Sequence, residues 1–442
     1  MIHLVLKPHR DSLQAGTTDL QKLFVLLKVI PAQSLAQVRP PLALAVVIDT
    51  SGSMRETVRG QSKLERAMAA TDAIISDARL SENDLISLIQ FDDVARVICP
   101  LSPIGNRRNA RSALKQLDNY SGGTRMAQGL LAAHRELSRI EQGGVATRVL
   151  VLTDGETFDP DDCPAAAAQL AALNAPLVTI GVGDSYNEEL LRDLAEIGRG
   201  RPYHLAEMER LGEIFQTEVG SSIREVITDL RAQVQTVAGV TLDSVTRVYP
   251  DLAEMNVVAS GDKMKLVALG NVAAGDYTVF VLELSLSGRA RNAGRARLAQ
   301  VKLSGAVPTS AGALESPVHD IVVAFSDQQA DVEAIDEEVL GYVQQRNADR
   351  LVQNALSLAP HDKEGARQSL QSALELTRRI GNPEVTRLLQ NSLDELADRG
   401  TLSSGTRKTI ALETRTRTIK TQSADTLGDM PDEAEIRRLT GA

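Results

Sequence analysis

The chain has 442 residues, of which 43% are hydrophobic and 3% aromatic, and it carries a formal net charge of -10. This length allows roughly two to four domains with sizeable aliphatic cores. The negative charge argues against a nucleic-acid binder that works through a generally basic surface. Cys99 and Cys163 are the only cysteines, which excludes a disulfide scaffold and a Cys-rich zinc motif.

The first ten residues lack a long apolar core followed by a cleavage site of small residues. No stretch approaches the about eighteen consecutive apolar residues of a membrane span. We therefore expect a soluble, cytoplasmic protein with no membrane span. Its Ala, Arg and Asp content is bacterial in style.

The apolar run 20–31 predicts one long strand closed by a proline, and residues 32–41 predict a linker. From Leu42 onward, apolar strands alternate with helical stretches. Helices are predicted at about 63–79, 106–116, 126–140, 163–173 and 187–197, and strands at 42–48, 85–91, 95–98, 149–152 and 177–182. Such alternation favours a doubly wound α/β layer.

Three segments of this layer carry oxygen ligands. Asp49, Ser51 and Ser53 follow a buried strand at alternate positions, so their oxygens can turn towards one point. Thr124 lies in a Gly-rich loop that opens a helix, and Asp154 follows a second buried strand. In a parallel α/β sheet, ligands sit outside the carboxyl ends of the strands. Oxygen-only ligands suit Mg2+, with Mn2+ or Ca2+ as alternatives, rather than zinc or copper.

Taken singly, each segment also has a structural explanation. Asp49 and Ser51 form a plausible Asx-turn, Thr124 a residue near a helix start, and Asp154-Gly155 a common turn. Together and in this order, however, the three segments resemble the von Willebrand factor A (VWA) family over roughly residues 40–220. The patterns that carry the resemblance are Asp-x-Ser-x-Ser, then Gly-Gly-Thr, then a strand ending in Thr-Asp-Gly. The resemblance implies a Rossmann-like α/β domain with a complete metal-ion-dependent adhesion site, in which the metal ligands are Asp49, Ser51, Ser53, Thr124 and Asp154.

The same resemblance implies a protein–protein interaction module rather than an enzyme. A partner would present a Glu or Asp side chain to the open coordination position of the cation. Thr124 and Asp154 would exchange direct and water-mediated contact, which could shift the final helix near 211–219. Related proteins work beside AAA ATPases or kinase and phosphatase pairs, so such partners are expected here.

Two other functions stay open. Mg2+ and carboxylates also serve phosphoryl transfer, so a metal-dependent phosphoester hydrolase is one alternative. Against it, no general base or nucleophile is evident, and the six histidines are scattered. The other alternative is a scaffold whose remaining domains do the binding while the metal is purely structural.

The whole chain is predicted to have five parts. Residues 1–40 add strands to a β-sandwich, the VWA domain spans 41–220, and an antiparallel β-sandwich spans 221–325; a helical domain spans 326–400, and a Thr-rich, disordered tail spans 401–442. We expect the strand at 20–31 to complete the sandwich, which makes the VWA domain an insertion. The helices show no tetratricopeptide period.

Thr426-Leu427-Gly428-Asp429 in the tail matches the phosphothreonine-x-x-Asp pattern that forkhead-associated domains recognise. Phosphorylation of Thr426 by a Ser/Thr kinase would add about two negative charges beside basic residues. A plain solvated tail is the simpler interpretation, because short motifs arise easily by chance.

Overall fold

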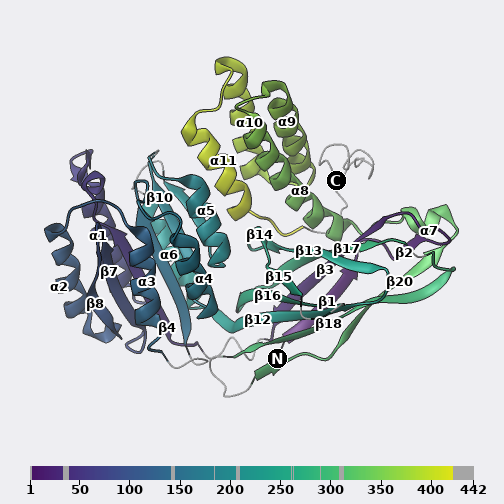
Figure 1. Cartoon of the computed structure of the whole chain (residues 1–442), viewed down its shortest axis with the longest axis horizontal. Coiled ribbons are helices and arrows are strands. Elements are labelled where there is room, and N and C mark those ends of the chain that lie inside the picture. The colour runs from purple at the N-terminus through teal and green to yellow at the C-terminus, as the bar shows by residue number, and fades with distance from the viewer. Residues whose placement is uncertain are drawn as a thin grey trace.

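The structure, a computed structural model, describes residues 2–32, 39–140, 145–183, 185–205, 210–259, 261, 263–288, 290–307 and 313–421. An α/β domain lies on the left of Figure 1, a β-sandwich on the right, and a bundle of helices above both. Within these ranges, no helix is long and apolar enough to cross a membrane.

The α/β domain is built on a six-stranded sheet, in which β7 and β8 pair antiparallel and the other neighbours pair parallel. In sheet order the strands are β11 (Pro202–Leu205), β10 (Leu177–Val182), β9 (Ala146–Thr153), β4 (Leu42–Asp49), β7 (Leu85–Phe91) and β8 (Ala95–Pro103). The helices are α1 (Lys63–Ser76), α2 (Arg107–Leu114), α3 (Met126–Leu137), α4 (Cys163–Ala172), α5 (Glu188–Ile197) and α6 (Leu211–Ser222). Short 3-10 helices occupy Gly52–Arg55, Ile104–Asn106 and Lys115–Asn119, and β5 (Thr57–Val58) and β6 (Gln61–Ser62) form a small hairpin.

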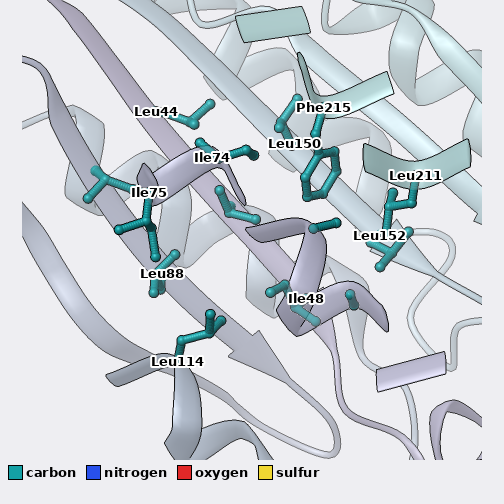
Figure 2. Packing of buried hydrophobic residues seen from close by; sticks show 14 of the residues in the cluster. Leu44, Ile48, Ile74, Ile75, Leu88, Leu114, Leu150, Leu152, Leu211 and Phe215 are labelled. Carbon is teal, nitrogen blue, oxygen red and sulfur yellow. The ribbon is translucent and has the colours of Figure 1, made fainter. Parts of the chain in front are cut away.

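Side chains alternate along the central strand β4 between two cores. Leu44 and Ile48 face α1, α2 and α6, where Phe215 of α6 also packs (Figure 2). Ala45 and Val47 face α3, α4 and α5. Burial on both faces explains why this strand is a continuous apolar run rather than an alternating one. The predicted doubly wound α/β class is confirmed.

The β-sandwich consists of two sheets. The first has the order β1 (Ile2–Pro8), β3 (Gln21–Pro31), β17 (Thr278–Leu286), β13 (Val240–Tyr249) and β14 (Ala253–Glu254). The second has the order β15 (Val257–Ala259), β16 (Met264–Ala273), β12 (Glu225–Thr236), β18 (Gly294–Ala306), β20 (His319–Ser326) and β2 (Ser12–Gln14), with β19 (Ala313–Glu315) beside β18. Apolar residues of both sheets, among them Val25, Leu282 and Val301, share one core.

Strand β3 pairs with β1 on one side and with β17 on the other. The N-terminal strands therefore belong to the sandwich, and the chain leaves it after β3 and returns at β12. The α/β domain is thus an insertion in the sandwich, which is the arrangement that the sequence led us to expect.

The C-terminal helices pack on the sandwich and on the α/β domain. They are α7 (Gln329–Glu333), α8 (Glu337–Leu358), α9 (Lys363–Arg379), α10 (Pro383–Arg399) and α11 (Ser404–Thr416). Val339, Tyr342 and Val343 of α8 bury against β3, β13 and β17. Lys408 of α11 donates a hydrogen bond to the carbonyl oxygen of Tyr186, at 3.2 Å, in the α/β domain.

The prediction of a disordered tail from residue 401 is wrong for the part that the structure describes, because α11 lies there. Ser403 caps this helix, and Ile410, Ala411 and Leu412 are buried. Arg415 pairs with Asp349 of α8 at 3.2 Å. The prediction failed because the segment is rich in Thr, while the apolar face of α11 is short and is buried only when the helix packs on other parts of the fold. Thr426 lies outside the described residues.

Buried ion pairs connect the α/β domain to the sandwich. Arg148 of β9 pairs with Glu218 of α6 at 3.3 Å and with Glu225 at the start of β12. Glu218 also accepts a hydrogen bond from Tyr203, at 2.6 Å, and pairs with Arg201 at 3.4 Å. Burial raises the pKa of Glu225, and the charge of Arg148 opposes that rise.

Replacing Arg148 with Met should leave the buried carboxylate of Glu225 without its cation and that of Glu218 with Arg201 alone. We expect Arg148→Met to lower the free energy of unfolding by about 3–5 kcal/mol. The control Arg111→Met breaks the exposed pair with Asp72 and should cost less than about 1 kcal/mol. Urea unfolding followed by circular dichroism measures both, and equal losses would contradict the role of burial.

Candidate metal-binding site

The candidate site lies at the carboxyl ends of the neighbouring strands β4 and β9. Asp49 is the last residue of β4, and Thr153 is the last residue of β9. The two strands pair in parallel with Ile48 opposite Leu152, so Asp49 and Thr153 come side by side. The Thr153 hydroxyl donates a hydrogen bond of 2.5 Å to Asp49 Oδ2. Strand register alone therefore fixes where the first carboxylate sits.

A chain of hydrogen bonds joins four of the five predicted ligands. Asp49 Oδ1 accepts the Ser51 backbone N–H at 2.8 Å. The hydroxyl oxygens of Ser51 and Ser53 lie 3.1 Å apart, and the Ser53 hydroxyl donates to Asp154 Oδ1 at 2.7 Å. The structure thus brings Asp49, Ser51, Ser53 and Asp154 together.

Thr124 reaches the same place from the loop before α3. Its carbonyl oxygen accepts the Phe158 N–H at 2.8 Å and the Thr157 hydroxyl at 3.1 Å, which fixes the loop. A Cβ placed on Gly155 would lie 4.0 Å from the Thr124 hydroxyl and 3.7 Å from that of Ser53. Both hydroxyls therefore lie close to the same point beside Gly155.

These residues fit a hard divalent cation. They offer two carboxylates and three hydroxyls, and Asp49, Ser51, Thr124 and Asp154 are buried. The 3.1 Å between the serine hydroxyls is close to the roughly 2.9 Å that separates adjacent ligands of octahedral Mg2+. Among the described residues, no group of three or more His, Cys, Asp or Glu side chains could hold a metal, so any site here relies on hydroxyls.

The electrostatics of the site depend on burial and on one lysine. Burial raises the pKa of Asp49 to about 6, although hydrogen bonds from Thr153 and Ser51 oppose the rise. Lys63, the first residue of α1, pairs with Asp154 at 2.6 Å and with Glu56 at 2.7 Å. Burial lowers the pKa of Lys63, but its bonds to these carboxylates outweigh that and raise it overall.

The rim of the site carries an exposed aromatic ring. Phe158 has the greatest exposed fraction, 69%, of the large hydrophobic side chains that the described ranges leave exposed. A Cβ on Gly123 would lie 2.6 Å from both the Phe158 ring and the Asp93 carboxylate. A side chain at Gly123 would therefore have to displace the Phe158 ring and the Asp93 carboxylate, and Phe158 lies against the loop that presents Thr124.

Sequence reasoning missed Thr153, Lys63 and Phe158. Thr153 could have been found, because it precedes Asp154 at the end of a parallel strand and so faces the neighbouring strand end. Lys63 gave no signal, since its approach depends on the β5–β6 hairpin that returns the chain to the site. Phe158 was visible as an apolar residue in an acidic loop.

Residues 43–217 match the model of the von Willebrand factor type A domain, and residues 337–420 match the Sll0103-like, C-terminal alpha-helical domain. The uncharacterized protein sll0103 of Synechocystis sp. is 25% identical over 389 residues, which cover 86% of this chain and 88% of that protein. The chain therefore contains a VWA domain with a Rossmann-like α/β fold, together with additional sheets and a C-terminal helical domain.

Two solved structures share this whole arrangement. The von Willebrand factor type A protein from Catenulispora acidiphila has a TM-score of 0.80 at 19% identity, and 94% of this chain and 97% of that chain are covered. The ArnB paralog VWA2 from Sulfolobus acidocaldarius has a TM-score of 0.59 at 15% identity, with 95% and 99% covered. At these identities the likeness shows a common fold.

Replacing Thr153 with Val keeps the side-chain shape but removes the donor to Asp49. We expect Thr153→Val to lower the free energy of unfolding in EDTA by about 1–3 kcal/mol, because the buried carboxylate loses a hydrogen bond. The matched control is Thr179→Val, which loses a buried hydrogen bond to the neutral carbonyl oxygen of Leu191. Urea unfolding compares the two variants, and a smaller loss for Thr153→Val would contradict the prediction.

Proposed function

We propose that this protein is a metal-dependent protein–protein interaction module. Mg2+, or alternatively Mn2+ or Ca2+, would be held by Asp49, Ser51, Ser53, Thr124 and Asp154, and it would bind a Glu or Asp side chain of a partner. The hydrogen-bonded chain of four ligand residues at the strand ends carries this proposal. VWA domains are generally non-catalytic interaction modules that commonly bind a divalent metal, which supports it.

The residues around the ligands would hold the site ready for the cation. Thr153 and the Ser51 N–H orient Asp49, while Ser53 and Lys63 hold the two oxygens of Asp154. When bound, the cation would supply a coordination position for an outside carboxylate. Because four of the five ligands are buried and hydrogen bonds already orient the carboxylates, binding costs little ordering of side chains.

Phe158 would add an apolar contact to the same interface. Its backbone N–H donates a hydrogen bond to the Thr124 carbonyl oxygen, so the backbone that carries the ring is fixed beside the expected metal position. Exposed aromatic residues with few rotatable bonds are favoured at protein interfaces. The partner would therefore pair an acidic residue with an apolar neighbour. From the family resemblance and the tail motif, we further propose that the partner is a cytoplasmic AAA ATPase, kinase, phosphatase or forkhead-associated protein.

Metal titration by calorimetry tests the site directly. We expect wild-type protein to bind Mg2+ or Mn2+, and Asp49→Ala to weaken that binding at least about 100-fold, because a buried carboxylate ligand is lost. Asp161→Ala removes the same charge from an exposed position of the loop after Asp154 and should leave the affinity unchanged. Equal affinity of Asp49→Ala and wild type would refute the proposed site.

Selection from a phage-displayed peptide library tests the partner chemistry. We expect peptides with Asp or Glu beside an apolar residue to be enriched in Mg2+ and lost in EDTA. Phe158→Ser should weaken the selected peptides roughly tenfold, since the peptide would no longer bury the ring, with metal affinity unchanged. Val318→Ser, which removes an exposed apolar side chain of the sandwich, is the matched control. Enrichment of the same peptides in EDTA would count against metal bridging.

A further inference from the structure

Lys63 places a positive charge inside the candidate site. Its ammonium nitrogen lies 2.6 Å from Asp154 Oδ2, on the opposite side of that carboxylate from Ser53, which contacts Oδ1. The side chain of Lys63 is 14% exposed and that of Asp154 is fully buried. The lysine thus fixes which oxygen of Asp154 is left to face the serine hydroxyls.

The chain around Lys63 holds it in this position. The backbone N–H of Lys63 donates to the Glu56 carbonyl oxygen at 3.2 Å, which closes the β5–β6 hairpin. Ser62 and Glu65 form a reciprocal capping box at the start of α1, with bonds of 2.7 and 3.1 Å. Because the capping box fixes the start of α1, the backbone of Lys63, its first residue, is held next to the site.

The charges of the site explain what this lysine does. Asp49 and Asp154 together cancel the two charges of a divalent cation, so those ligands alone would leave a neutral site with little attraction for a third carboxylate. Lys63 adds one positive charge. Glu56, its other partner, has a side chain that is 67% exposed and therefore well screened by water.

We propose that Lys63 sets the charge of the metal site, weakening the binding of the cation and strengthening the binding of the partner carboxylate. By itself the lysine repels the cation and weakens metal binding. Once the cation is bound, the surplus positive charge of Lys63 strengthens the binding of a carboxylate, while the mutual stabilisation of cation and carboxylate comes from the bond between them. This inference rests on the proposed function, and it concerns a residue that is not itself a metal ligand.

Two measurements on Lys63→Gln and Lys63→Arg test the inference. Calorimetry should show that Lys63→Gln binds Mn2+ about tenfold tighter than wild type, the effect of one charge roughly 6 Å from a dication in a water-like medium. Line broadening of acetate methyl protons by protein-bound Mn2+ should show that the loaded variant binds acetate several-fold more weakly. Lys63→Arg keeps the charge and should behave as wild type in both.

Glu56→Gln gives an independent variant at an exposed position. This substitution removes the carboxylate that offsets part of the positive charge of Lys63. Mn2+ should therefore bind a few-fold more weakly and acetate more tightly, which are the opposite changes from those of Lys63→Gln. Lys302→Gln, which breaks a lysine–glutamate pair on the sandwich, is the neutral control.

The outcomes separate the two proposals. Suppose that wild type binds Mn2+ and acetate, and that neither Lys63→Gln nor Glu56→Gln changes the affinity for Mn2+. The role of Lys63 is then refuted, while the proposed metal site stands. If wild type binds no Mn2+, the proposed function is refuted, and so is the role of Lys63 that depends on it.

Discussion

Parallel strands end at the same edge of a sheet, and the pairing of β4 with β9 therefore decides where Asp49 and Asp154 meet. A shift of one residue in that register would turn Thr153 away from Asp49 and bury the wrong side chain. The apolar side chains of β4, which alternate between two helical layers, enforce the register from both faces. The site is thus maintained by the core, and its loops only need to supply short polar side chains.

A network of buried charges lies where the chain returns from the inserted α/β domain to the sandwich. Helix α6 ends at Ser222 and β12 begins at Glu225, so almost no flexible chain separates the two domains. Arg148 bonds to Glu218 on one side of this junction and to Glu225 on the other. Any displacement of α6 must therefore carry the sandwich with it or separate buried ion pairs, which is costly in a low dielectric.

Local patterns were enough to predict the alternating elements of the α/β domain, the sandwich strands and the set of oxygen-bearing residues at the strand ends. Periodicity and turn residues act over short distances, so they are visible in the sequence. Helix α11 was missed because its apolar face is short and is buried not only by the neighbouring α10 but also by α8, which lies far away along the chain, while the helix also packs on β11 of the α/β domain. Lys63 was missed for the same reason, since a charge on an amphipathic helix gives no sign of the carboxylate it will meet.

The pairing of β3 with β17 has a consequence for how the chain is made. On the ribosome, β3 emerges at residues 21–31, while the strand that must cover its other edge ends at residue 286. The whole α/β domain is synthesised in between and is contiguous, so it can form while the sandwich is still incomplete. Until then β1 protects one edge of β3, and the other edge stays an open template for other chains. The period of greatest aggregation risk for this protein therefore falls during synthesis, between the emergence of β3 and the arrival of β17.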